Sequence, residues 1–392
     1  MDERQNLLTR IEATDRELAK AKAVLDGIGL GAGASSWYSE DLLKLQRELR
    51  DRQDRLDDLG KDVKSCQDLK PSWEALAVLR GDCEPLFAES LAMALGPLVR
   101  GSGLDSGLGE IADALVRDLN RATLNSWSQN TLLAEAEYVG EMNRVIRLRF
   151  PVTSVWDLPL VAHEYGHLVG FELERQGKLD ALLKASAENF RMTAWLREHW
   201  ADTFATFALG PAFACTCLLT RLDPSGDPNR GFPSHPSDAM RAHAILSVLR
   251  TMSQAAGLIG SMTDIIGYLD QFWSSATQST GRGAGPDASH RARIDGWLTV
   301  FLSLLGTRQL RDSRYAGWRN VGETRNRLFD PNSLEATEPD RTKEGIADVV
   351  NAAWLARIEQ VPTDQDDRRL SERAIRACRS LALEPREDRR MR

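Results

Sequence analysis

The sequence predicts a mainly helical protein of the α+β class, with an N-terminal helical hairpin or bundle ahead of a larger helical domain that holds a small sheet. Three observations favour this fold class: seven-residue apolar repeats near the N-terminus, apolar residues at helical spacing along most of the remaining chain, and one clear strand pattern. The chain has 392 residues, of which 42% are hydrophobic and 27% charged, so it can bury a core in each of two or three domains.

Apolar residues recur every seven positions in the first part of the chain, which indicates two helices that pack as a coiled coil. They are Ile11, Leu18 and Leu25 in the first helix and Leu42, Leu49, Leu56 and Val63 in the second. The glycine-rich segment 27–36 is the predicted turn, and Thr14 and Arg52 weaken the seam. We favour an antiparallel pair packed on the rest of the chain over an arm that docks a partner or oligomerises, because short heptad runs are common in helical proteins.

Two further helices and a strand follow the hairpin. The helices are predicted over 72–100 and 108–134, with a loop rich in Gly and Ser at 101–109 between them. In residues 144–150 apolar and charged side chains alternate with the period of a half-buried strand. This is the clearest strand pattern in the chain.

The remaining chain is again predicted to be mostly helical. Helices are expected at 157–175, 179–208, 238–256, 260–277, 290–306 and 341–359, with loops at 222–237 and 279–289. The whole pattern predicts four parts: a hairpin at 1–70, a helical linker region at 71–135, a main domain at 136–360 and a charged tail at 361–392. We expect the tail to be frayed or bound to the surface because it is dense in charge.

Composition excludes several classes of protein. The net charge of −7 provides no overall positive field, so no nucleic-acid partner is expected. The first twenty residues are charged and contain no apolar core of a secretory signal, which favours a cytoplasmic location. Five scattered cysteines without a CxxC pair predict neither a disulfide framework nor a zinc ribbon, and Cys215 and Cys217 are expected to fill the core.

The uncharged segment 203–220 approaches the length that crosses a bilayer. Gly210 and Pro211 interrupt it, and several of its residues are small or hydroxylated. We therefore expect two short core helices and no transmembrane segment.

Two histidines four positions apart frame a glutamate at His163, Glu164 and His167. The surrounding residues have helical apolar spacing, and Asp157 at the start can cap the helix. Residues i and i+4 share one face of a helix, so both imidazoles can converge on one metal ion. The carboxylate between them can then reach a water bound to that metal.

Zinc peptidases with this HExxH motif differ chiefly in the third ligand. Leu173 occupies the position where one class has a third histidine. Glu198 and Asp202 stand four residues apart in an otherwise apolar and aromatic helix, where an unpaired carboxylate would be costly to bury. Glu198 can therefore be the ligand, and Asp202 can accept the outer N–H of a ligating histidine. His199 is an alternative ligand, but only Glu198 has an aspartate at i+4.

With the Glu198–Asp202 pair after His163-Glu164-x-x-His167, the chain resembles the gluzincin zinc metallopeptidases. It is most similar to the group with an ExxAD third-ligand helix, which includes membrane-bound prenyl-protein endopeptidases and soluble bacterial relatives. The resemblance implies a zincin-like metallopeptidase domain.

The same group carries a downstream His-Pro with an Arg a few residues later, and this chain has His235-Pro236 and Arg241. The resemblance covers roughly residues 145–245. The gap between the second histidine and Glu198 is longer than in thermolysin, and the membrane helices of the prenyl-protease group are not evident. The substrate of that group is therefore not carried over.

The resemblance implies that His163, His167 and Glu198 bind Zn²⁺, with water in the fourth position. The metal would acidify this water, and Glu164 would take its proton as the water attacks a peptide carbonyl, then pass the proton to the leaving amine. Asp202 would orient one ligating imidazole, that of His163.

The resemblance further implies that His235 stabilises the oxyanion and that Arg241 shapes the site or binds substrate. A plain loop histidine and a surface salt-bridging arginine are the alternatives. Tyr165, inside the motif, is expected to pack in the core. The strand at 144–150 either borders the cleft and pairs with extended substrate, or is an ordinary interior strand.

Two functions remain open at this stage. The first is a zinc-dependent endopeptidase acting on a protein or peptide, with the N-terminal helices selecting the substrate. The second is a partner-binding or assembly protein whose metal site is structural or vestigial. We favour the peptidase because a structural zinc site does not need a buried glutamate between its histidines. A peptidase of this kind would need to be held latent, and residues 279–289 or the tail are candidates to cover the cleft.

Overall fold

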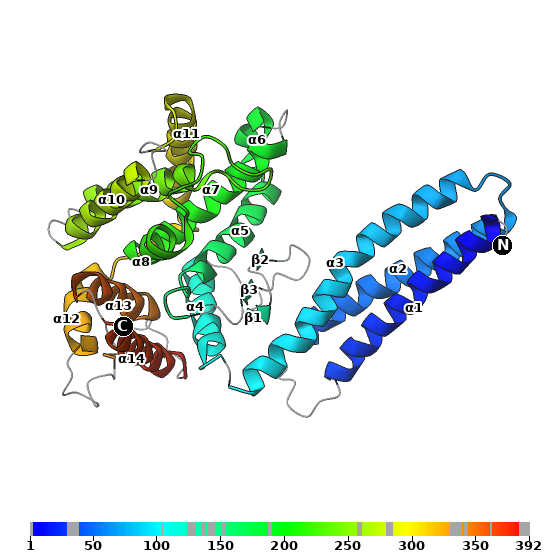
Figure 1. The fold of residues 1–392 in the computed structure, drawn as a ribbon, viewed down its shortest axis with the longest axis horizontal. Helices are drawn as coiled ribbons and strands as arrows, with labels where there is room; N and C mark the ends of the chain where they lie inside the picture. Colours follow the sequence, from blue (N-terminus) through cyan, green and yellow to red (C-terminus); the bar gives the residue numbers. More distant parts are fainter. Residues whose placement is uncertain are drawn as a thin grey trace. The chain divides into compact units, whose positions relative to one another are not determined.

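The computed structural model confirms a mainly helical protein. It describes residues 3–29, 39–103, 105–123, 131–134, 138–139, 146–149, 154–186, 190–256, 261–279, 285–329, 339–340, 344–360 and 363–383. These residues form fourteen α-helices, together with three strands of at most four residues (Figure 1). The chain divides into two compact units. Unit 1 comprises Met1–Asp105, Asn130–Ala136 and Arg147–Phe150, and unit 2 comprises the remainder.

Unit 1 is built on three long helices that pack along one another: α1 (Glu3–Gly29), α2 (Ser39–Ser65) and α3 (Lys70–Gly101). The predicted heptad residues are buried where these helices pack; they are Ile11, Leu18, Leu25, Leu42, Leu49, Leu56 and Val63. Helix α3 joins this pair as a third helix, beginning two residues earlier than predicted. Most of the predicted turn at 27–36 lies outside the described residues.

The two polar residues in the seam have local partners. The hydroxyl of Thr14 donates to the carbonyl of Arg10 over 3.1 Å, so a buried Thr costs little in a helix. The guanidinium of Arg52 pairs with Glu48 one turn earlier, at 3.3 Å, and with Asp51. The seam therefore accommodates both residues without breaking the heptad packing.

The three strands are β1 (Thr131–Ala134), β2 (Tyr138–Val139) and β3 (Ile146–Arg149), hydrogen-bonded in the order β1-β3-β2. Strand β3 falls within the predicted segment 144–150, and its alternate residues Ile146 and Leu148 are buried. Its central place in that order favours the interior strand over one that pairs with substrate. The small sheet expected as part of the main domain is not seen there, because β1 and most of β3 belong to unit 1.

Unit 2 holds the other eleven helices. They are α4 (Leu108–Thr123), α5 (Leu160–Arg175), α6 (Asp180–Ser186), α7 (Phe190–Leu209), α8 (Pro211–Thr216), α9 (Asp238–Ala256), α10 (Ser261–Ser279), α11 (Ala288–Leu305), α12 (Trp318–Phe329), α13 (Ile346–Gln360) and α14 (Asp364–Leu383). Helices α5 and α7 pack on each other at its centre, with α9 and α11 against α7 and α4 against α5. The long gap after the HExxH motif contains α6.

The uncharged segment 203–220 forms the end of α7, then α8 and a short π-helix at Cys217–Arg221. Gly210 divides it with a φ of +61°, and a Cβ there would lie 2.6 Å from the Tyr315 ring. Cys215 and Cys217 are fully buried, as predicted for core residues. Among the described residues, no helix has both the length and the apolar character needed to cross a membrane.

Three local predictions were wrong. The helix predicted over 108–134 ends at Thr123, and residues 131–134 are strand β1, because a strand partner outweighs local helix propensity. Helix α5 begins at Leu160 after a turn, and the carboxylate of Asp157 does not cap it. Instead it accepts hydrogen bonds from the amide and hydroxyl of Ser154 and pairs with Arg221 at 2.9 Å.

The charged tail is not frayed over residues 364–383. It forms helix α14, which packs on α13, α4 and α12. Its apolar stripe of Leu370, Ala374 and Cys378 is buried, while charged residues such as Asp367, which pairs with Arg357 at 2.8 Å, occupy the rest. The high charge density therefore marks the outer face of an amphipathic helix. Residues 384–392 lie outside the described chain.

Burial in the heptad seam predicts a contrast between two leucines of α2. Leu49 is fully buried and Leu43 is half exposed. Leu49→Ala should lower the free energy of unfolding of unit 1 by about 2–5 kcal/mol, because it removes buried methyl groups and leaves a cavity. Leu43→Ala should change it by less than about 0.5 kcal/mol. Urea unfolding followed by far-ultraviolet circular dichroism measures both, and equal losses would show that the seam does not hold the unit together.

Candidate metal centre

The centre is built where α5 and α7 come close together. Two glycines make this approach possible, because a Cβ on Gly166 would lie 3.0 Å from the Cα of Ala201, and one on Gly170 would lie 2.8 Å from the Trp200 indole. The indole N–H of Trp200 donates to the carbonyl of Gly166 over 2.8 Å. Arg197 adds a paired contact to Glu174 at 2.7–2.8 Å. These contacts fix the spacing between the two helices that carry the predicted ligands.

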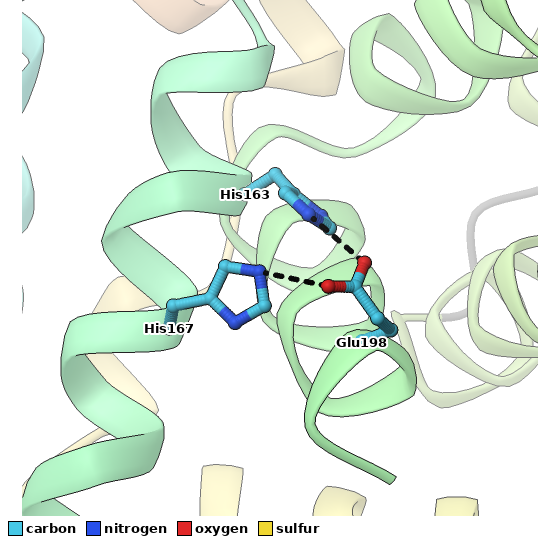
Figure 2. A group of neighbouring side chains, drawn as sticks. All are labelled: His163, His167 and Glu198. Carbon is cyan, nitrogen blue, oxygen red and sulfur yellow. Dashed lines mark ion pairs between the residues drawn. The ribbon is translucent and has the colours of Figure 1, made fainter. Parts of the chain in front are cut away.

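His163 and His167 on α5 face Glu198 on α7 (Figure 2). The Nε2 atom of His163 lies 3.6 Å from Glu198 Oε2, and Nε2 of His167 lies 3.5 Å from Glu198 Oε1. All three groups offer ligand atoms within 4.8 Å of one another, and His163 and Glu198 are buried. They form a group that can hold a metal ion.

Two observations fit a cation between these groups. In a tetrahedral Zn²⁺ site with bonds of about 2.0–2.1 Å, ligand atoms lie about 3.3 Å apart. The two histidine–glutamate distances seen here are close to this value and longer than a good hydrogen bond. The Oε2 atom of Glu198 is also buried without a hydrogen-bond partner. A buried carboxylate oxygen without a partner is costly, and a cation would satisfy it.

Next to the ligands, Asp202 on α7 contacts side chains of two neighbouring helices, α5 and α9. Its Oδ1 lies 3.0 Å from Nδ1 of His163, which orients that imidazole with Nε2 toward Glu198. Arg241 on α9 donates two hydrogen bonds to the same carboxylate, from Nε over 2.9 Å and from Nη2 over 2.7 Å. Arg241, whose side chain is 16% exposed, is thus paired with Asp202, and its predicted role toward substrate stays a prediction.

Charges in the centre are strongly coupled. Burial disfavours the imidazolium of His163, but the Asp202 and Glu198 carboxylates outweigh it and raise its pKa to about 10. Burial and the charge on His163 lower the pKa of His167 to about 4. Burial would raise the pKa of Glu198, yet the two histidines lower it to about 2. Burial likewise opposes ionisation of Asp202, but Arg241 holds its pKa well below the ordinary range.

Glu164 and His235 complete the set of predicted residues. Glu164 is buried on α5 between the two histidines, about 100° around the helix from His163. His235 lies on the loop before α9, with its Nε2 3.6 Å from Glu198 Oε1 and its Nδ1 2.8 Å from the Ser234 hydroxyl. Its side chain is 53% exposed, so it stands on the solvent side of the ligands.

His199, the alternative ligand, is not in the metal-binding group. Its ring is fully buried and packs on Trp297, with ring centroids 5.6 Å apart. Burial lowers its pKa to about 4, so it is neutral at pH 7. Tyr165 is buried as predicted, and its hydroxyl also bonds with Thr123 at 2.7 Å and Asn120 at 2.9 Å on α4.

Sequence reasoning missed the pairing of Arg241 with Asp202 and the role of Gly166 and Gly170. A signal for the first was present, because Arg241 has apolar neighbours in the sequence such as Met240 and Ala242, and an arginine in an apolar helix needs a carboxylate partner. No pattern in the sequence revealed the second, because close packing of two helices depends on what faces each glycine.

Comparison of the chain with protein-family models, with curated proteins and with solved structures found no match in any of the three.

The protonation of His163 predicts how metal binding depends on pH. In the metal-free protein a proton occupies His163, whose pKa is raised to about 10, and a cation must displace that proton. The apparent affinity for Zn²⁺ should therefore rise about tenfold per pH unit between pH 6 and 8. Competition with a chromophoric chelator of known pH dependence measures this. An affinity that does not change with pH would show that binding displaces no proton from His163.

Removal of Arg241 should destabilise the protein far more than removal of Arg197. Arg241→Gln leaves the buried charge of Asp202 without its arginine partner, so we expect a loss of about 3–5 kcal/mol in the free energy of unfolding. The matched control, Arg197→Gln, breaks a pair whose arginine is 40% exposed, and should cost about 1 kcal/mol or less. Chemical denaturation of both variants tests this, and similar losses would mean that Asp202 does not depend on Arg241.

Proposed function

We propose that this protein is a zinc-dependent endopeptidase of the gluzincin type. The observation that carries the proposal is the meeting of His163, His167 and Glu198 around one point, with Glu164 between the two histidines on the same helix. Three protein ligands leave a position open, which is typical of catalytic rather than structural zinc sites. The set of two histidines and one glutamate is also the donor set of known zinc peptidases.

When bound, Zn²⁺ would polarise a peptide carbonyl and lower the pKa of a water molecule toward neutrality. Glu164 would accept a proton from that water at its carboxylate and deliver it to the nitrogen of the leaving amine. Asp202 lies against Nδ1 of His163, which leaves Nε2 on the Glu198 side, where it would be available to the cation. Arg241 supports this arrangement by keeping Asp202 ionised.

His235 supports the proposal from the solvent side. Its side chain is half exposed and its Nε2 lies near Glu198. It can therefore donate a hydrogen bond to the oxyanion that would form on the substrate's carbonyl oxygen beside the metal-binding group. The substrate we propose is a polypeptide, because the site supplies groups for amide hydrolysis.

Partner binding is the second candidate function, and a feature of unit 1 favours it. Leu91, Leu95 and Leu98 lie on one face of α3 and are 56%, 48% and 69% exposed. A row of exposed leucines at helical spacing is a common mark of an interaction surface. A protein that acts only through this surface would keep its function when Glu164 is replaced, whereas the proposed peptidase would lose it.

Replacement of Glu164 by glutamine tests the peptidase directly. Glu164→Gln should retain one bound Zn²⁺ per chain but lose about 10²–10⁴-fold in hydrolysis, because the base is gone while the ligands remain. Glu172→Gln on the same helix is the matched control, since Glu172 pairs with Arg175 near the helix end. Zinc content is measured by atomic absorption, and cleavage by comparing new protein N-termini in cells that express each form. Unchanged cleavage by Glu164→Gln would refute the mechanism.

A further inference from the structure

Phe232 is an exposed aromatic residue on the loop that carries His235. Among the large apolar side chains that the structure shows as exposed in the described chain, it has the highest exposed fraction, 75%. Single exposed apolar residues are common on protein surfaces, so exposure alone does not mark a site. Phe232 differs from the other exposed apolar residues because its loop also carries His235.

This loop is held in place by contacts on both sides of Phe232. The indole N–H of Trp195 donates to the Phe232 carbonyl over 2.9 Å. A Cβ at Gly231 would lie 2.5 Å from the His235 carbonyl and 2.7 Å from the Trp195 ring, so only glycine fits there. The hydroxyl of Ser237 donates to the Pro228 carbonyl over 2.6 Å. The exposure of the Phe232 ring is therefore a fixed feature of a packed loop.

Both ends of the segment from Phe232 to His235 contact α7 beside the metal-binding group. Trp195, which holds Phe232, precedes Glu198 by about 4.5 Å along the axis of α7. His235 has its Nε2 3.6 Å from Glu198 Oε1. The residue that anchors the Phe232 backbone, Trp195, is thus within one helical turn of a proposed zinc ligand, and His235 on the same loop lies beside that ligand.

We propose that Phe232 contacts the substrate and selects polypeptides with a large apolar or aromatic side chain within a few residues of the scissile bond. An aromatic ring offers a broad apolar contact with only two side-chain torsions, so little entropy is lost when it binds. A peptide that places its carbonyl at the metal-binding group would lie near this loop, because His235 of the loop is 3.6 Å from Glu198. The inference rests on the proposed peptidase function and names its substrate class.

The test uses the full chain loaded with Zn²⁺ and a combinatorial library of synthetic decapeptides. Phe232→Ser should abolish the enrichment of apolar residues near the cleaved bond and raise KM for the preferred sequences about tenfold, with a smaller change in kcat. Phe232→Leu should restore most of the preference. Phe272→Ser is the matched control, because Phe272 on α10 is also partly exposed, at 37%. An unchanged profile in Phe232→Ser overturns the inference, as does an equal change in the control.

A binding measurement separates this inference from the proposed function. The zinc-loaded Glu164→Gln variant is immobilised, and the decapeptides that it retains are sequenced with and without Phe232→Ser. Retention of apolar peptides that is lost in the double variant supports the role of Phe232, even if the wild-type protein cleaves nothing and the peptidase proposal fails. Retention without apolar enrichment, or unaffected by Phe232→Ser, overturns the inference. Zinc affinity must stay unchanged in Phe232→Ser, since a loss there would show a structural role instead.

Discussion

The centre of unit 2 depends on the burial of two carboxylates, Glu198 and Asp202, one turn apart on α7. A buried carboxylate is stable only with positive or hydrogen-bonding partners around it. Asp202 has two, His163 from α5 and Arg241 from α9. Because these partners come from different helices, the same charge that is costly to bury also ties three helices together.

Glu198 is compensated differently. Three imidazoles face it at 3.5–3.6 Å, those of His163 and His167 on α5 and that of His235, and one of its oxygens has no hydrogen-bond partner. Asp202 is thus satisfied by the protein itself, whereas Glu198 is left with capacity for a further positive group. This difference explains why α7 can carry two carboxylates with different roles. Asp202 positions a histidine, whereas Glu198 is able to bind a metal ion.

The variable positions of the HExxH motif are also constrained by packing. Tyr165 reaches α4 through hydrogen bonds to Thr123 and Asn120, and Gly166 lets the backbone of α7 approach to contact distance. The part of α5 from His163 to His167 therefore has one face that offers ligands and another that packs against neighbouring helices. A substitution at Gly166 would move α7, and with it Glu198, without touching any ligand.

Local spacing determined much of this protein from the sequence alone. The heptad seam of unit 1, the strand at 144–150, and the common faces of His163 with His167 and of Glu198 with Asp202 all follow from the fixed rise and turn of helices and strands. Each of these features depends only on residues a few positions apart in the chain, so it can be predicted from the sequence.

Tertiary structure decided what faces each of these elements. It paired Arg241 with Asp202, set Gly170 against Trp200, turned residues 131–134 into a strand and folded 364–383 into a packed helix. The physical reason is that such contacts join residues far apart in the chain, and their free energy depends on which surfaces meet and on the charges buried there. The spacing of residues within one helix or strand does not determine which surfaces meet.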